Sequence, residues 1–276
     1  IRWPIALRFN PLGDLFCTDQ EGATWLPNGN PFDELLHVQP GRHYGFPPRH
    51  PKHLPNVIDE PSVYDYGPQH QSACGMNFNE PVNGGPVFGP AWWRGDALVV
   101  GESRGKLYRT KLVKTEAGYV AHNEIFACLG MLTIDACVSP GGELRVCTHS
   151  GDPDWGTGPK GEGQIWRVRY DRQSDAPQPV MTWRQSPDEI RVAFDRTLPP
   201  NFELDGVTIH ASPNARAGDR FETMRPPYEV VKRQMTEGHA EIHVHETQKL
   251  PDHSNQISII TDAISDQTWL SVDLRH

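Results

Sequence analysis

The sequence lacks several patterns that would assign a function class directly. Its five cysteines form neither a Cys-x-x-Cys pair nor a Cys-x-x-Cys-His run, which excludes the usual zinc and covalent haem motifs. No apolar run reaches the roughly 20 residues that a membrane-spanning helix needs. The formal net charge of −9 argues against nucleic acid as a partner, because phosphate backbones are bound by clustered cations.

Helical periodicity is also scarce, whereas turn-forming residues are abundant. The 276 residues include 26 prolines and 25 glycines, and no long stretch repeats apolar residues at the spacing of an α-helix. The hydrophobic content of 37% is that of a globular protein. These features predict an all-β, turn-rich chain that is long enough for one large or two modest domains.

One hairpin pattern occurs three times within the first 170 residues. Its clearest copy has a turn at 94–96, an apolar strand at 97–100, and a second, half-exposed strand at 107–112 that ends in basic residues. The same order of strand, glycine turn and strand surrounds Gly13 and Gly142. Antiparallel repeats of roughly 40–50 residues are typical of β-propeller blades. A β-sandwich with similar hairpins is the alternative.

Four segments give this pattern a family likeness. Residues 4–15, 33–41, 43–47 and 93–100 resemble, in the same order, segments of the soluble PQQ-dependent sugar dehydrogenases. That group contains glucose, aldose and sorbosone dehydrogenases, which are six-bladed β-propellers. The resemblance covers only the later blades, so it implies a C-terminal portion of a propeller that upstream blades or another chain would complete. It also implies a periplasmic or extracellular location.

The resemblance implies where a cofactor and a metal would bind. Arg2 falls on a cofactor-binding arginine and Gln20 on a glutamine that contacts the quinone. The backbone carbonyls of Glu21 and Gly22 fall on ligands of a calcium ion, and hard oxygens of this kind suit Ca²⁺. An acidic, solvated loop is the alternative interpretation of this segment.

Two further residues are candidates for the same site. His70 lies in a segment that resembles the entry to the next blade near the central channel, although a structural histidine would look the same. Arg104 stands next to the position where the family has a lysine. The family's general-base histidine lies upstream of the matched region, so no histidine of this chain inherits that role.

Four positions depart from the family's cofactor site. Trp3 replaces an asparagine, Ser103 a lysine, and Leu132 and Ile134 two arginines. PQQ carries three carboxylates, and charge-assisted hydrogen bonds contribute roughly 1.5–3 kcal/mol each. Losing three cationic partners therefore removes roughly 4–9 kcal/mol of binding free energy. We expect that PQQ does not bind, whereas the calcium turn is retained.

Two function classes remain open at this point. The first is a carbohydrate- or aldehyde-directed oxidoreductase module with a degenerate PQQ site, part of a larger protein. The second is a non-catalytic propeller that serves for binding or as a scaffold, as a module of a larger protein, because a fold does not fix a function. A small sugar or a polysaccharide is the expected partner.

The last third of the chain has a different pattern. Residues 1–175 are expected to form the propeller blades and residues 176–185 a linker. Residues 186–276 contain alternating strands separated by turns, which predicts an immunoglobulin-like β-sandwich. His243 and His245 share one face of such a strand, but without a further ligand they do not define a metal site. All five cysteines are expected to be free, buried thiols.

Overall fold

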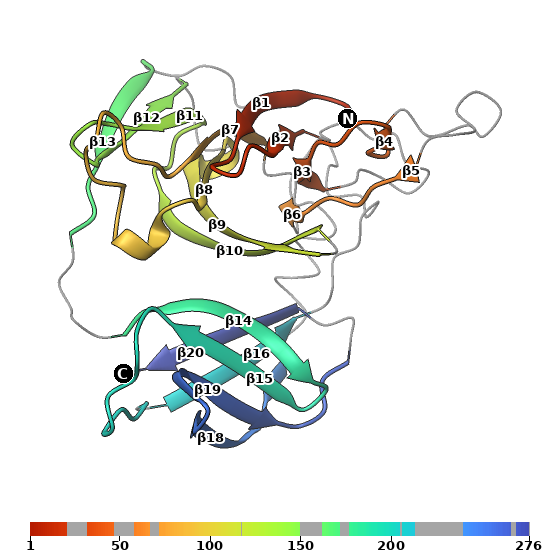
Figure 1. The fold of residues 1–276 in the computed structure, drawn as a ribbon, viewed down its shortest axis with the longest axis vertical. Coiled ribbons are helices and arrows are strands. Elements are labelled where there is room, and N and C mark those ends of the chain that lie inside the picture. The colour runs from red at the N-terminus through yellow and green to blue at the C-terminus, as the bar shows by residue number, and fades with distance from the viewer. Residues whose placement is uncertain are drawn as a thin grey trace. The chain divides into compact units, whose positions relative to one another are not determined.

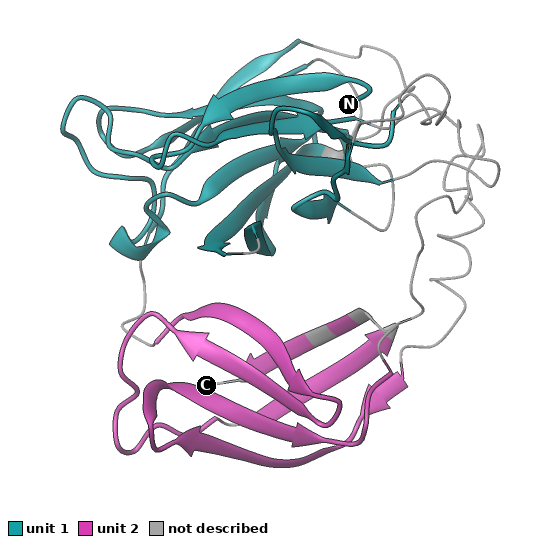
Figure 2. Cartoon of the chain, turned by 45° about the vertical axis from the view of Figure 1, so that its right-hand side comes forward, with its two compact units in different colours: residues 1–171, 216–225 teal, residues 172–215, 226–276 magenta. Residues whose placement is uncertain are grey.

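A computed structural model describes residues 1–20, 32–46, 58–66, 72–116, 118–149, 162–171, 177–204, 206–212, 240–265 and 269–275. Within these residues the regular elements are β-strands and two short 3-10 helices, which confirms the all-β prediction (Figure 1). None of the helices described is long and apolar enough to cross a membrane. The chain divides into two compact units, with β1–β13 in the first and β14–β20 in the second (Figure 2).

The first unit contains three antiparallel sheets that follow one another along the chain. Their strand orders are β1-β2-β3-β6, β10-β9-β8-β7 and β11-β12-β13. The strands are β1 (Pro4–Phe9), β2 (Leu15–Asp19), β3 (Asp33–His37), β6 (Tyr64–Tyr66), β7 (Ala73–Phe78), β8 (Ala97–Gly101), β9 (Lys106–Thr115), β10 (Gly118–Cys128), β11 (Thr133–Val138), β12 (Leu144–Thr148) and β13 (Gln164–Val168). A short parallel pair, β4 (Arg42–His43) and β5 (Ile58–Asp59), falls between β3 and β6 in the sequence.

In each sheet the strands lie side by side in the order in which they occur along the chain. Such an antiparallel meander is the arrangement of a propeller blade. The three predicted turn glycines, Gly13, Gly95 and Gly142, all have positive φ angles. Residues with a side chain rarely adopt this backbone conformation, whereas glycine adopts it readily. The predicted hairpins are therefore confirmed. β10 was not predicted as a strand: residues 114–130 were interpreted as a connection between blades, because this polar sequence carries little alternation.

Two apolar layers join the three sheets. Between the first and second sheets, Phe16 and Leu35 pack with Met76 and Phe78. Between the second and third sheets, the residues in contact are Leu98, Val100 and Leu107 with Ala136, Val138, Leu144 and Val146. The middle sheet is thus covered on both faces, and every residue of β8 is buried. A propeller builds its core from such layers between neighbouring blades.

Each sheet has a β-bulge near the start of its first strand. The register shifts between Pro4 and Ala6 in β1, between Ala73 and Met76 in β7, and between Thr133 and Asp135 in β11. A bulge interrupts the alternation of side chains between the two faces of a strand. Cys74 accordingly packs in the layer with the third sheet, whereas Met76 packs in the layer with the first.

The strand that was predicted to be half-exposed and basic contains a buried cation. Arg109 of β9 has a fully buried side chain and donates to Asp96 Oδ2 at 2.6 Å and to Glu124 Oε1 at 2.7 Å. Its guanidinium carbon lies 4.6 Å from the ring centre of Trp92 and 4.9 Å from that of Trp93, both in η1 (Ala91–Trp93). The half-exposed prediction was wrong at Arg109, because two carboxylates and two tryptophan rings surround the guanidinium and allow its charge to be buried.

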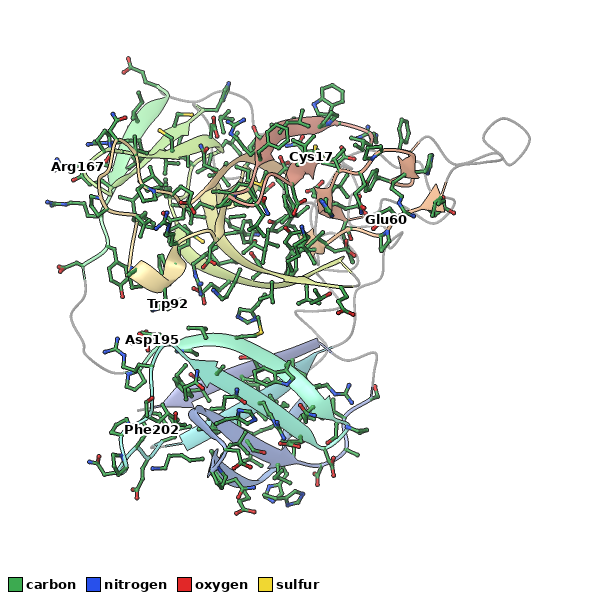
Figure 3. All side chains as sticks on the ribbon, in the orientation of Figure 1. Cys17, Glu60, Trp92, Arg167, Asp195 and Phe202 are labelled. Carbon is green, nitrogen blue, oxygen red and sulfur yellow. The ribbon has the colours of Figure 1, made fainter. Side chains whose placement is uncertain are left out.

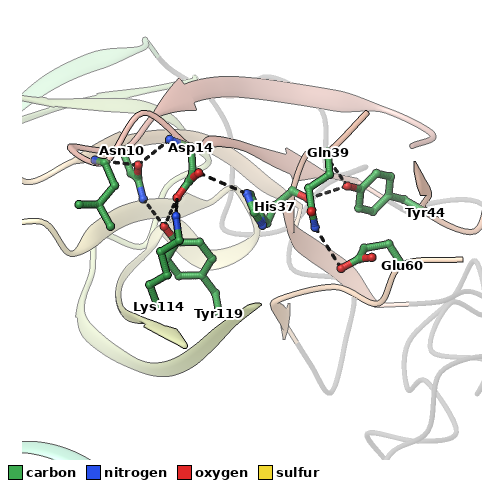
Figure 4. A network of polar contacts seen from close by, with 9 residues as sticks. Asn10, Asp14, His37, Gln39, Tyr44, Glu60, Lys114 and Tyr119 are labelled. Carbon is green, nitrogen blue, oxygen red and sulfur yellow. Dashed lines mark hydrogen bonds and ion pairs between the residues drawn. The ribbon is translucent and has the colours of Figure 1, made fainter. Parts of the chain in front are cut away.

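A polar network ties the β9–β10 hairpin to the first sheet (Figure 4). Asp14, in the turn between β1 and β2, accepts hydrogen bonds from Lys114 Nζ at 2.7 Å and from the hydroxyl of Tyr119. These two donors hold the pKa of the Asp14 carboxyl below its usual value. His37 Nε2 lies 3.9 Å from the other oxygen of the same carboxylate. The network therefore connects residues about 100 positions apart in the sequence.

The second unit is a sandwich of two antiparallel sheets, with strand orders β14-β15-β19-β18 and β17-β16-β20. Its strands are β14 (Pro179–Ser186), β15 (Glu189–Phe194), β16 (Gly206–Ser212), β17 (Ala240–Ile242), β18 (Val244–Leu250), β19 (His253–Thr261) and β20 (Trp269–Arg275). An apolar core contains Ile190, Phe202, Ile209 and Ile259 (Phe202 is labelled in Figure 3). The prediction of a sandwich is confirmed, and its immunoglobulin-like character stays a prediction.

The predicted linker is wrong over most of its length. Residues 179–185 belong to β14, which pairs with β15 along the edge of a sheet. The serine, proline and glutamine content that indicated a linker is compatible with a half-exposed edge strand, and proline is tolerated at the first position of such a strand. Residues 172–176 lie outside the described part.

The cysteine prediction is confirmed in one respect and wrong in another. None of the five cysteines is in a disulfide. Cys17 and Cys74 are buried as expected, but Cys128 and Cys137 are exposed and Cys147 is half-buried. Cys137 is exposed because it lies on the face of the third sheet that points away from the second.

Candidate functional site

The polar residues of interest gather at one end of the three sheets in the first unit. The register pairs Pro4 with Asp19, Ala73 with Gly101, and Thr133 with Thr148. The starts of β1, β7 and β11 and the ends of β2, β8 and β12 therefore lie at the same end of their sheets. We call this the Arg2 end. Hydrogen bonds link neighbouring sheets there, from Thr18 Oγ1 to the carbonyl of Cys74 and from Thr133 Oγ1 to that of Gly101.

Arg2 and Gln20, both predicted at the cofactor site, are in contact. Arg2 Nη1 donates to the carbonyl oxygen of Gln20 at 3.2 Å, and its guanidinium carbon lies 5.9 Å from the centre of the Phe46 ring. The buried carboxylate of Asp19 accepts the backbone N–H groups of Arg2 and Trp3, at 2.8 and 2.6 Å. Burial raises the pKa of Asp19, and the two N–H donors oppose that shift. Asp19 therefore fixes the start of β1.

The amide of Gln20 reaches across to the second sheet. Its Nε2 donates to the sulfur of Cys74 at 3.0 Å, and that sulfur lies 4.0 Å from Oε2 of the buried Glu102. Burial, with the negative charges of Glu102 and Asp33, raises the pKa of the Cys74 thiol far above its usual value. The thiol is thus neutral at physiological pH and is no nucleophile. Gln20, Cys74 and Glu102 form a polar contact between two sheets that sequence analysis did not predict.

The other predicted site residues are placed as follows. Trp3 is 59% exposed, whereas Ser103 and Leu132 are buried and Ile134 is half-buried. Arg104 lies in η2 (Ser103–Gly105), and its side chain is outside the described part. Glu21, Gly22 and His70 also lie outside the described residues. The structure thus brings Arg2 and Gln20 together, and it leaves the calcium turn and His70 as predictions.

Acidic side chains are buried in the part of the Arg2 end that the structure describes. PQQ carries three carboxylates, which need cationic partners. The buried charged residues at this end are instead the acids Asp19, Asp33 and Glu102. Leu132, at one of the expected arginine positions, offers only a buried apolar side chain. Arg2 is a cation at this end and the side chain of Arg104 is outside the described part, so the failure of PQQ to bind stays a prediction.

No metal site appears elsewhere in the described residues. No group of three or more histidine, cysteine, aspartate or glutamate side chains within these ranges could hold a metal ion. His243 and His245 do lie together, with ring centres 4.7 Å apart, and His245 Nε2 is 2.8 Å from Asp262 Oδ1. This arrangement is a carboxylate–histidine hydrogen bond on an exposed strand.

Comparison with known proteins gives a partial structural likeness. No family model and no curated protein matches the sequence. Among solved structures, a Thermus thermophilus protein described as an oxidoreductase of the glucose dehydrogenase type matches with 24% identity and a TM-score of 0.42, over 59% of this chain and 44% of that one. The soluble aldose sugar dehydrogenase of Escherichia coli in its apo-form matches with 16% identity and a TM-score of 0.40, over 60% and 44%.

A structure named glucose dehydrogenase matches with 19% identity and a TM-score of 0.43, over 61% of this chain and 44% of that one. The chain therefore spans less than half the length of these solved proteins. Their names are those of the sugar dehydrogenase group that the sequence resembles.

Proposed function

We propose that the first unit is the sugar dehydrogenase-like propeller module of a larger carbohydrate- or aldehyde-directed oxidoreductase, and that its Arg2 end binds the sugar. The observation that carries this proposal is the convergence of Arg2, Gln20 and Glu102, which flank β1, β2 and β8, at one end of two sheets. A guanidinium, an amide and a carboxylate supply both donors and acceptors, which a polyhydroxylated ligand needs. The carbonyls of Glu21 and Gly22 are proposed to hold Ca²⁺ beside them.

The quinone site of this module is proposed to be degenerate. The buried acids of the Arg2 end, Asp19, Asp33 and Glu102, together with Leu132, would disfavour an anionic cofactor, so PQQ has no part in the proposed function. A neutral sugar carries no charge that these acids would repel. The residues of the chain then act by binding and orienting the sugar hydroxyls, and electron transfer depends on an acceptor in the rest of the protein.

A non-catalytic sugar-binding module is the second candidate. The observation in its favour is that two titratable groups at the Arg2 end are unsuited to catalysis. The Asp19 carboxylate is held by two backbone N–H groups, and the Cys74 thiol is kept neutral by burial. Neither group is placed to take a proton from a sugar hydroxyl.

Binding is tested by titrating aldoses into the full chain in a calorimeter, with and without Ca²⁺. We expect Gln20→Ala to weaken sugar binding by about 2- to 12-fold, because one lost hydrogen bond corresponds to about 0.5–1.5 kcal/mol. Arg94→Ala is the control, since Arg94 is exposed and pairs with Glu80 away from the Arg2 end. Absence of sugar binding by the wild-type chain would contradict the proposal.

Catalysis and cofactor are tested together. The chain is mixed with PQQ and Ca²⁺, and aldose oxidation is followed with a dye acceptor. We expect no PQQ binding at micromolar concentration. Micromolar PQQ affinity with turnover would refute the degenerate site and restore an ordinary quinone-dependent dehydrogenase. Sugar binding without turnover by the longer protein that contains this module, with any acceptor, would favour the second candidate.

A further inference from the structure

The second unit contains a cavity at one side of its sandwich. Its volume of about 600 Å³ falls within the roughly 300–1,000 Å³ that small-molecule sites occupy. The apolar side chains that line it are Phe202, Leu204, Val207, Val244 and Ile257. The charged and polar residues that line it are Glu203, Thr247, Gln248 and Lys249. An apolar wall with a few polar groups beside it is the usual composition of a ligand site.

The edge strand β18 presents polar residues to the inside of the sandwich at this cavity. Among the described strands β18 pairs only with β19 (Figure 1). Thr247 lies opposite Ile259 and Lys249 opposite Ile257, and residues directly opposite each other in an antiparallel pair point to the same face. Ile257 and Ile259 are core residues, at 1 and 0% exposure, so Thr247 and Lys249 point to the core side. Both are nevertheless exposed, because the sandwich is open beside them.

The facing sheet does not extend over this position. β17 pairs with β16 only at residues 209–211, and the chain then passes to the other sheet, where β18 begins at Val244. Gly206 and Val207, at the start of β16, line the cavity and pair with β20 alone among the described strands. The apolar wall therefore faces an open space and not a further strand of the described sheets.

Lys249 is a fixed cation beside this wall. Its Nζ donates to the carbonyl oxygen of Pro199 at 3.2 Å and to that of Pro200. These two bonds hold the ammonium in place without neutralising it, and one of its three N–H donors remains available. No carboxylate of the described residues pairs with Lys249. Glu203 also lines the cavity, but its exposed side chain has no hydrogen bond or ion pair with a described residue and is free to turn into solvent.

We propose that this cavity binds a medium-chain fatty acid, with the hydrocarbon chain against the apolar wall and the carboxylate at Lys249 and the hydroxyl of Thr247. Burying the chain removes apolar surface from water, and the fixed ammonium complements a single negative charge. An inward-pointing lysine can also serve only to protect an edge strand from pairing, in which case no ligand would bind. The inference concerns the second unit alone and is independent of the proposed sugar binding.

Calorimetric titration of octanoate and decanoate into the full chain, below their micellar concentrations, tests the proposal. We expect saturable binding at one site per chain. Decanoate should bind about 15-fold more tightly than octanoate, because each further buried methylene contributes about fourfold in affinity. Decylamine should bind more weakly than decanoate, since its charge would meet that of Lys249. No saturable binding of decanoate, or tighter binding of decylamine, would overturn the proposal.

Lys249→Met separates the charge from the apolar wall. We expect decanoate binding to weaken about fivefold, the upper end for a partly exposed ion pair, and the binding of uncharged decanol to stay unchanged. Lys114→Met is the matched control, because Lys114 is an exposed lysine of the first unit and its loss should affect neither ligand. An equal loss of decanoate and decanol binding in Lys249→Met would mean that Lys249 only supports the wall, and the proposal would be wrong.

Val207→Phe locates the ligand within the chain. The larger ring takes up part of the cavity, so the binding of both decanoate and decanol should weaken by roughly tenfold. Val120→Phe is the control, because Val120 is 51% exposed on β10 of the first unit. Circular dichroism would verify that both variants are folded, and the Lys249→Met comparison stands if Val207→Phe is not. Unchanged binding in folded Val207→Phe would place the ligand elsewhere and refute the proposal.

Discussion

The buried arginine of the second sheet gives the sharpest test of how the first unit is stabilised. In Arg109→Met, a side chain of similar length fills the space between Trp92 and Trp93, but the partner of Asp96 is lost. The Asp96 side chain is 3% exposed, and its remaining cation is Lys111, with Nζ 3.5 Å from Oδ1. Breaking a buried ion pair from one side typically costs about 3–5 kcal/mol, because the other charge stays desolvated.

We expect a loss of that size in the free energy of unfolding of the first unit. Total stabilities are about 5–15 kcal/mol, so the variant would lose a large fraction of its stability. Urea unfolding followed by tryptophan fluorescence is a suitable assay, since two indoles lie against the guanidinium. The control is Glu124→Gln: the Glu124 side chain is 35% exposed, and partly solvated pairs contribute about 0–1 kcal/mol.

A double variant separates the charge from the packing. In Arg109→Met with Asp96→Asn, the stranded negative charge is gone, so the combined loss should be smaller than the sum of the two single losses. Additive losses would contradict a direct coupling between the two side chains. A loss below about 1 kcal/mol in Arg109→Met alone would mean that Asp96 is hydrated in solution, and the reasoning from burial would fail.

Three further outcomes are expected. The pKa of Asp14 is lowered in the folded state, so the stabilisation that its carboxylate gives is present above the unfolded pKa of about 3.9 and is lost as the pH falls through the folded pKa. The free energy of unfolding of the wild type should exceed that of Asp14→Asn by at most about 1 kcal/mol near pH 7, and thermal melts in acid should show this difference disappear. Gly75→Ala should cost about 1–3 kcal/mol, because its Cβ would lie 2.0 Å from Asp135 Oδ1 and 2.5 Å from Asp135 Cα. Gly141→Ala, whose Cβ would lie 3.9 Å from Ser139 Oγ, should change stability by less than about 0.5 kcal/mol. The exposed thiols of Cys128 and Cys137 should react with a disulfide reagent in the folded protein, and the buried thiols of Cys17 and Cys74 only after unfolding. Rapid reaction of all five thiols would contradict the burial of Cys17, and burial raises the pKa of this thiol to about 12.

Local patterns in the sequence predicted the hairpins well. Turn glycines and short apolar runs placed β8 and β12 correctly, because a tight turn and a buried strand are encoded by adjacent residues. The second unit was predicted from alternation alone, as in β15 and β19. The β17–β18 stretch was expected as one strand and is two, which separate at His243.

The sequence was least informative where residues far apart meet. Arg109 looks like a surface cation until Asp96 and two tryptophans are placed around it, and these contacts depend on the pairing of β8 with β9 and on the position of η1. Cys74 and Gln20, 54 positions apart, gave no signal of their contact. The predicted linker failed for a related reason, because composition cannot distinguish a polar edge strand from a connection. Arg2 and Gln20 were identified by resemblance, and their juxtaposition required the register of β1 with β2.

The bulges at the starts of β1, β7 and β11 have a consequence for how this protein can change over time. Each bulge lies at the Arg2 end of its sheet, close to where the strand begins. A substitution ahead of the bulge therefore does not have to satisfy the alternation that the layers impose on the rest of the strand. The scaffold can keep its packing while the end of each sheet acquires different side chains.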